Sequence, residues 1–184
     1  MNIIQKPSPN FSEQLLNPSL ILMHWTGDIS DEGAVSWLTN SASKASAHYV
    51  IGRTGAVWQL VPTDKQAWHA GVSEWQGRSN CNQFSIGIEM VCAGEVLPSG
   101  ANFKTVGYGK PVLKTDAVQC EGKFYQRYTE LQLSAVRELI LSLIEKFPSI
   151  KEMAGHRDVS PGRKTDPGPH FPMAQICSLL EGRQ

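Results

Sequence analysis

The sequence predicts a single-domain α/β protein, and three observations support that prediction. Its 184 residues are enough to bury a sizeable core in one domain. Several short apolar runs, typical of buried strands, are separated by turn-forming residues. One long segment, residues 130–147, has the apolar periodicity of an amphipathic helix. Because no repeat or linker divides the chain, we expect one domain over residues 1–184, with an inserted loop or flap at about 93–128.

The first half of the chain reads as alternating strands and a helix. Residues 1–18 are polar and are expected to run over the surface. Leu20–His24 is an apolar run that predicts a buried strand with a histidine at its carboxyl end. Asp31 is a candidate N-cap for a helix over about 32–40. Its apolar side would consist of Val35, Trp37 and Leu38.

A hairpin and a further strand follow. Residues 47–51 and 56–61 are predicted strands joined by a turn at Thr54-Gly55. His48 lies within the first of them and is expected to have a structural role. Residues 84–91 form the next predicted strand, after a loop that begins at Trp68.

The second half contains a poorly patterned segment and the clearest helix. Residues 93–128 have no convincing period, and at most a short hairpin is expected at Val112-Leu113 and Phe124-Tyr125. Thr129 is the predicted N-cap of the helix over 130–147, and Gln132 completes a capping box. Its apolar stripe consists of Leu131, Leu133, Val136, Leu139, Ile140, Leu143 and Ile144. A loop at 155–169 and a short helix at 172–181 are expected to follow.

Composition excludes some functions and leaves others open. Lysine plus arginine and aspartate plus glutamate both number 17, so no excess charge favours a nucleic-acid or anionic-membrane partner. The four cysteines lack CxxC spacing, and free thiols are expected. No charged, then apolar, leader opens the chain, and no apolar run is long enough to span a membrane. We therefore expect a cytoplasmic monomer, unless another route releases or exports it.

Residues 155–169 hold the strongest chemical signal. His156 begins this Pro- and Gly-rich loop, Asp166 lies near its end, and Lys164 stands two residues before the carboxylate. An imidazole and a carboxylate are ordinary zinc ligands, and His24 at the end of its strand is the best candidate for a third. The alternative is a plain loop in which the backbone satisfies His156 and Asp166 caps a turn.

A second signal is the glutamate in the strand at 84–91. Alternation places Ser85, Gly87 and Glu89 on one face of that strand. A carboxylate on an otherwise apolar strand is costly unless it is paired or hydrated. This favours a general acid/base that faces a cleft, against the alternative of an edge-strand glutamate in solvent.

The chain resembles the zinc-dependent N-acetylmuramoyl-L-alanine amidase family, which includes AmpD, some phage endolysins and the peptidoglycan-recognition proteins. The resemblance rests on five segments in the family's order: LILMHWTGD, SAHYVIGRTGAVWQLVP, AWHAGVS, QGRSNCNQFSIGIEM and GHRDVSPGRKTDPGP. They cover most of residues 20–170 and are most similar to the AmpD branch. The resemblance implies a central mixed β-sheet flanked by helices. It also implies hydrolysis of the amide bond between N-acetylmuramic acid, or its 1,6-anhydro form, and L-alanine.

The resemblance also implies the site. His24, His156 and Asp166 match the three ligands of one Zn²⁺ ion. Glu89 matches the catalytic glutamate of the AmpD branch, and Lys164 matches the catalytic lysine. Some relatives have a catalytic tyrosine where this chain has Ala47, which leaves that role to Glu89. Substrate-binding positions are expected at Trp68, His69, Lys44 and Arg78.

Two departures bear on the substrate. Lys44 and Asn80 stand where arginines are expected in the AmpD branch, and the 93–128 insertion is longer than in the compact AmpD pattern. We interpret the insertion as a flap over one rim of the cleft that contacts glycan or stem peptide. A competing hypothesis is a non-catalytic peptidoglycan-binding or sensing module. Muropeptide recycling, phage-type lysis and delivery as an antibacterial effector all remain open as biological roles.

Overall fold

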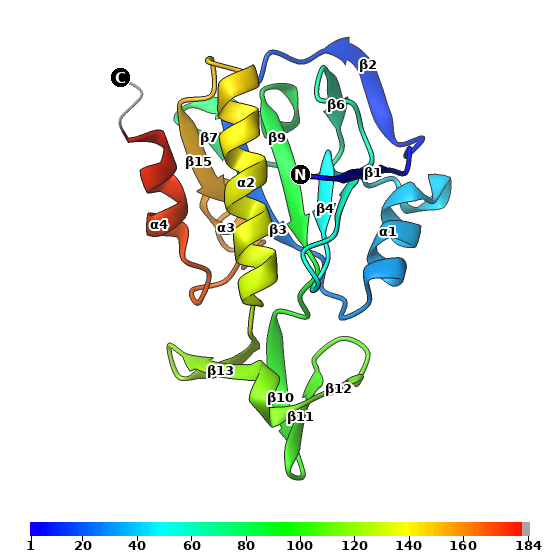
Figure 1. Cartoon of the computed structure of the whole chain (residues 1–184), viewed down its shortest axis with the longest axis vertical. Helices are drawn as coiled ribbons and strands as arrows, with labels where there is room; N and C mark the ends of the chain where they lie inside the picture. The colour runs from blue at the N-terminus through cyan, green and yellow to red at the C-terminus, as the bar shows by residue number, and fades with distance from the viewer. Residues whose placement is uncertain (182–184) are drawn as a thin grey trace.

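Six strands form a mixed sheet at the centre of the computed structural model, which describes residues 1–181 (Figure 1). Their spatial order is β1 (Ile3–Gln5), β5 (Val57–Gln59), β4 (Tyr49–Ile51), β9 (Ser85–Met90), β3 (Leu20–Trp25) and β15 (Glu152–Gly155). Neighbouring strands are parallel except β4 and β5, which are the two arms of the predicted hairpin. The α/β class and the mixed sheet are therefore confirmed.

Helix α2 (Glu130–Lys146) covers one face of this sheet, with α4 (Met173–Cys177) beside it (Figure 1). The predicted capping box is present: Thr129 Oγ1 accepts from Gln132 N at 3.0 Å, and Gln132 Oε1 accepts from Thr129 N at 3.1 Å. The buried stripe of α2 packs on side chains that alternate along β3 and β9. These side chains are Ile21, Met23, Ile86, Ile88 and Met90. Leu131, at the start of the predicted stripe, is exposed instead.

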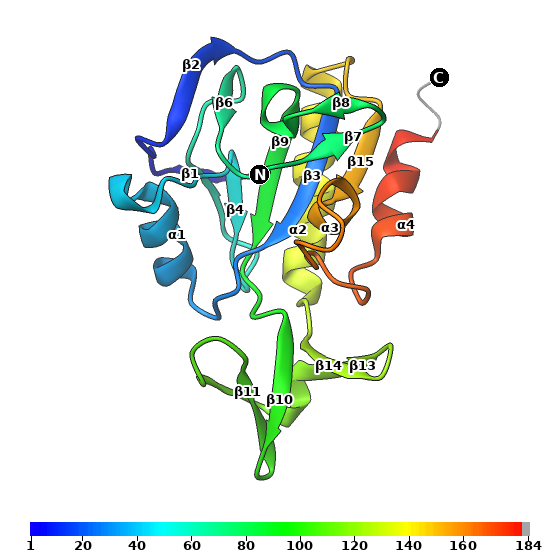
Figure 2. The ribbon, with the colours of Figure 1, turned by 180° about the vertical axis from the view of Figure 1, so that it is seen from behind.

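The opposite face carries α1 (Asp31–Thr39) and the single turn α3 (His156–Val159), as Figure 2 shows. The N-cap of α1 is Ser30 rather than Asp31, because Ser30 Oγ accepts from Gly33 N at 3.1 Å. Val35 and Leu38 pack on the sheet as expected, but Trp37 is 60% exposed. The indole lies on the flank of α1 that borders the cleft described below.

Segments expected to be irregular contain additional short strands. Strand β2 (Phe11–Leu15) pairs with β6 (Lys65–Ala67), and β7 (Glu74–Trp75) pairs with β8 (Arg78–Ser79). The remaining short helices are η1 (Ser41–Ser43), η2 (Cys81–Gln83), η3 (Lys114–Asp116) and η4 (Ser178–Leu180). Together, α4 and η4 account for the helix predicted at 172–181. The structure shows all four cysteines as free thiols, as predicted, and no helix within residues 1–181 is long and apolar enough to cross a membrane.

Residues 93–128 fold into a second, antiparallel sheet, which we call the extension. Its spatial order is β12 (Pro111–Val112), β11 (Asn102–Thr105), β10 (Glu95–Ser99), β14 (Lys123–Gln126) and β13 (Ala117–Cys120). Figure 1 shows it projecting below the main sheet, beyond the end of β9. The expectation of a largely irregular segment was wrong. These strands are two to five residues long and gain their order from pairing with one another.

His48 is buried, directly precedes β4 in the chain, and is held by two hydrogen bonds. Gly87 N donates to its Nδ1 at 3.0 Å, and its Nε2 donates to the Lys65 carbonyl at 2.9 Å. These partners require the neutral imidazole, because a protonated Nδ1 cannot accept from an amide. Burial is the main cause that lowers the pKa of His48, to about 4, although the bond to Lys65 opposes it. Its role is structural, as predicted.

This buried histidine predicts a loss of stability in mild acid. The unfolded chain binds a proton at His48 near pH 6.5, while the folded chain binds it only near pH 4, so stability falls as pH decreases between these values. From pH 7 to pH 5 the loss attributable to His48 is about 2 kcal/mol. Urea unfolding at both pH values measures it. The His48→Gln variant should lose less stability than the wild type over this interval, and equal losses would contradict the assignment.

Candidate metal and catalytic site

The register of two parallel strands brings the first two site residues together. β3 and β9 pair so that His24 lies directly beside Glu89. The face of the sheet that packs against α2 presents Ile21 and Met23 from β3, and Ile86, Ile88 and Met90 from β9. His24 and Glu89 alternate with them and so lie on the opposite face, where α1 and α3 are found. The predicted alternation of β9 is therefore confirmed.

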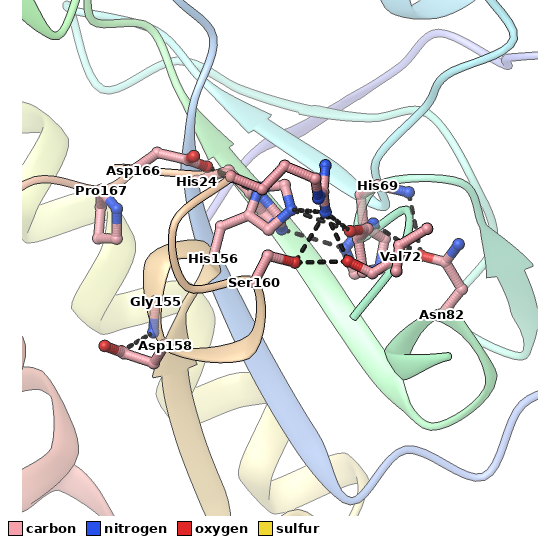
Figure 3. Close-up of polar contacts among 12 residues, drawn as sticks. His24, His69, Val72, Asn82, Gly155, His156, Asp158, Ser160, Asp166 and Pro167 are labelled. Carbon is pink, nitrogen blue, oxygen red and sulfur yellow. Dashed lines mark hydrogen bonds and ion pairs between the residues drawn. The ribbon is translucent and has the colours of Figure 1, made fainter. Parts of the chain in front are cut away.

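Three side chains meet over this edge of the sheet (Figure 3). His24 Nδ1 lies 2.9 Å from His156 Nδ1 and 3.1 Å from Asp166 Oδ2, and His156 Nδ1 lies 2.9 Å from the same oxygen. All three residues are buried. His156 is placed by α3, which follows β15, and the Asp166 carbonyl accepts from Arg157 N at 2.8 Å. Residues far apart in the sequence thus present one ligand atom each to a common point.

Hydrogen bonds on the outer side of the two rings orient them. His156 Nε2 lies 3.0 Å from the Ala70 carbonyl, which can only accept, so Nε2 carries the proton and Nδ1 presents a lone pair to the centre. His24 Nε2 lies 3.0 Å from His69 Nδ1. Burial, together with the neighbouring histidines, lowers the pKa of His69 well below its usual value and keeps that ring neutral.

The donor set fits a zinc ion. Zinc bonds of about 2.0–2.1 Å in a tetrahedron place neighbouring ligand atoms about 3.3 Å apart, close to the separations found here. Burial lowers the pKa of His24. Burial alone would raise the pKa of Asp166, but the close contacts with His156 and His24 outweigh it and lower the pKa of this carboxyl below its usual value. Neutral imidazoles and an anionic carboxylate crowded around one point are the forms that a divalent cation stabilises.

Glu89 borders this centre with an unused carboxylate oxygen. Among the described residues, none forms a hydrogen bond with its buried Oε2. Burial and the nearby Asp166 charge raise the pKa of Glu89 well above its usual value, and Lys164 partly offsets them. A buried carboxyl whose pKa is raised in this way, beside a potential metal centre, is a candidate general base.

A cleft of about 610 Å³ is lined by two of the three potential ligands, His156 and Asp166, and by Glu89. It is lined by residues from the end of β3, α1, the loop at 45–46, the loop at 68–69, the extension and the loop before Asp166. These residues are Trp25, Thr26, Gly27, Asp28, Gly33, Ala34, Trp37, Leu38, Ala45, Ser46, Trp68, His69, Glu89, Tyr108, His156, Arg163, Lys164, Thr165 and Asp166. Its volume is in the range of small-molecule sites.

The other residues expected at the site fall into two groups. Trp68, His69 and Lys164 line the cleft, and the Lys164 side chain is exposed to solvent. Lys44 is exposed and lies outside the cleft lining. Arg78 is also outside it, with its guanidinium 3.7 Å from the centre of the Phe84 ring and Nη1 donating to Ser19 Oγ. A substrate-binding role for these last two residues stays a prediction.

Arg163 is a site residue that the sequence reasoning did not single out. Its Nη2 donates to the carbonyls of Ala70 and Val72 and to Ser160 Oγ, each at 2.7 Å. It therefore ties the loop that carries His69 to the loop that carries Asp166, and it shares the Ala70 carbonyl with His156. The only sequence signal was its position three residues before Asp166, within the RKTD motif.

Comparison with known proteins agrees with this geometry. The family model described as N-acetylmuramoyl-L-alanine amidase matches residues 14–169. The chain is 37% identical over 157 residues to 1,6-anhydro-N-acetylmuramyl-L-alanine amidase AmpD of Escherichia coli K12, an alignment that covers 85% of this chain and 69% of that protein.

Two solved structures extend the comparison to the fold. A crystal structure of a selenomethionine AmpD derivative superposes with a TM-score of 0.69 at 32% identity, covering 97% of this chain and 94% of that one. The E. coli amidase AmiD, solved with anhydro-N-acetylmuramic acid-L-Ala-D-γ-Glu-L-Lys, superposes with a TM-score of 0.68 at 27% identity, covering 89% of this chain and 57% of that one.

Proposed function

The chain belongs to the N-acetylmuramoyl-L-alanine amidase family, and on this premise we propose the bond that it cleaves. It hydrolyses the amide between the lactyl carbonyl of N-acetylmuramic acid, or of its 1,6-anhydro form, and the amine of L-alanine in the stem peptide. The observation that carries the proposal is the convergence of His24, His156 and Asp166 beside Glu89, at the base of one cleft that His156, Asp166 and Glu89 line. The substrate of AmiD in its solved complex has this linkage.

The residues that would hold the zinc ion are His24 and His156, through their Nδ1 atoms, and Asp166, through its carboxylate. When bound, zinc supplies a Lewis acid and lowers the pKa of a water molecule at its open position. The surrounding residues do the rest. Arg163 and the Ala70 carbonyl hold His156, and His69 holds His24.

We assign the proton transfers to Glu89. Glu89 lies beside His24, and among the described residues none forms a hydrogen bond with its Oε2. Its raised pKa suits a group that takes a proton from the attacking water and later gives it to the departing L-alanine amine. The ammonium of Lys164, exposed on the cleft wall, would stabilise the negative charge that develops on the lactyl carbonyl oxygen. Trp68 and His69 line the same cleft and are proposed to contact the substrate.

The competing hypothesis is a peptidoglycan-binding module without catalysis. Loss of a metal ligand or of the general base would favour it. This chain keeps three potential ligands together, with a buried carboxylate beside them. The retained set favours the enzyme.

A direct experiment separates these two functions. The purified protein, either zinc-loaded or depleted by a chelator, is incubated with MurNAc-L-Ala-D-isoGln, and released α-amine is quantified. Zinc-loaded protein should release the dipeptide with a free L-alanine N-terminus, and depleted protein should not. Saturable binding of the ligand without any amine release would instead establish the binding module.

A further inference from the structure

Two exposed aromatic side chains border the cleft on different elements. Trp37 lies on α1 and is 60% exposed, and Tyr108 lies in the turn between β11 and β12 of the extension and is 74% exposed. Burial would stabilise large aromatic side chains such as these. Their exposure in the lining of a cleft therefore indicates a binding site. Aromatic rings stack on flat, partly apolar ligand surfaces, and the C–H face of a pyranose ring is such a surface.

The position of Tyr108 is set by contacts on both sides of the cleft. The β11–β12 turn is closed by two hydrogen bonds: Thr105 N donates to the Lys110 carbonyl at 2.8 Å, and Lys110 N donates to Thr105 Oγ1 at 3.0 Å. The Lys110 ammonium lies 2.7 Å from Asp28 Oδ1 and 5.6 Å from the centre of the Tyr108 ring. Asp28 is itself fixed, because the same oxygen accepts from Ile29 N at 2.7 Å. The bridge joins the extension to the loop that follows β3.

The basic residues and the two aromatic residues that line the cleft come from different segments of the chain, which we call its basic end and its aromatic end. Among the described residues that line it, the lysine and arginine side chains are Arg163 and Lys164, in the loop before Asp166. An anionic stem peptide is therefore attracted to that end. At the aromatic end, Asp28 is neutralised by Lys110. A neutral ligand with a stacking face suits this end better than a peptide that carries carboxylates.

We propose that Trp37 and Tyr108 form a stacking site for a second saccharide ring, joined to the muramoyl residue whose amide is cleaved. This inference rests on the proposed function and deepens it. The chain would prefer a substrate with at least two sugar rings over a single-sugar muropeptide. The extension supplies half of that site, which gives the inserted segment a specificity role.

The test compares two substrates with the same peptide, GlcNAc-MurNAc-L-Ala-D-isoGln and MurNAc-L-Ala-D-isoGln. Tyr108→Ala and Trp37→Ala should each lower kcat/KM at least fivefold more on the disaccharide substrate than on the single-sugar substrate. Tyr108→Phe keeps the ring and should keep the wild-type ratio. Val106→Ala, at an exposed position in the same turn but outside the cleft lining, is the matched control.

A binding measurement makes the test independent of turnover. In a Glu89→Gln background, calorimetry should show that Tyr108→Ala weakens the disaccharide ligand at least fivefold more than the single-sugar ligand. Equal losses on both ligands would mean that the ring contacts the muramoyl group or peptide, and would overturn the proposal. In the kinetic test, an unchanged ratio of kcat/KM between the two substrates in Tyr108→Ala and Trp37→Ala would overturn it as well. Failure of the wild type to cleave either substrate would count against the proposed amidase function, while the binding ratios still decide this inference.

Discussion

Asp166→Ala is expected to lose its zinc and its activity together. The substitution removes the one anionic group of the centre and leaves two neutral imidazoles, which are too few to hold zinc with an open position. Its Oδ2 lies within 3.1 Å of Nδ1 of both histidines, so the substitution also removes the group nearest to both rings. We expect zinc content near zero after dialysis and turnover at the limit of detection, measured by elemental analysis and amine release.

A surface carboxylate provides the control for this substitution. Asp64→Ala removes an exposed carboxylate outside the cleft lining and should keep both zinc and activity. Chelation of the wild type should abolish turnover, and added zinc should restore it. Undiminished turnover of fully metal-depleted protein would refute the assignment of the three ligands.

Glu89→Gln and Lys164→Ala are expected to separate chemistry from metal binding. Each should lower kcat on the order of a hundredfold or more, since general-base and oxyanion-stabilising groups typically contribute that much. Both should retain zinc, because neither side chain is among the three grouped ligands. Parallel measurement of kcat and bound zinc for each variant decides the point.

Matched variants guard against a general loss of activity. Glu145→Gln and Lys151→Ala alter exposed positions outside the cleft lining and should behave as the wild type does. If Glu89→Gln kept a near-wild-type kcat, the buried carboxylate would have no part in proton transfer. The same result for Lys164→Ala would remove that ammonium from the mechanism.

The parts of the fold that were predictable depend on local patterns. The capping box of α2 and the alternation along β9 involve residues a few positions apart, and both were confirmed. The alternation was enough to place Glu89 on the face opposite α2. Motif resemblance identified the residues of the centre, and the fold brings His24, His156 and Asp166 together.

The parts that were missed depend on partners distant in the chain. The strands of the extension are too short to show a period and are ordered by their neighbours. Trp37 faces a cleft that is also lined by Tyr108, more than sixty residues later in the sequence, so the local pattern of α1 could not predict its exposure. Arg163 donates to the backbone carbonyls of Ala70 and Val72, and a pattern of side chains along the sequence cannot predict contacts with a distant backbone.

The span of the centre along the chain has a consequence for synthesis. One imidazole belongs to β3, the second strand of the six-stranded sheet to be made, and the other two ligands come from residues 156 and 166, more than 130 positions later. A nascent chain therefore lacks a complete zinc site until nearly all of the domain has left the ribosome. On the proposed assignment, the three-ligand site would be complete only after β3 and β15 have paired.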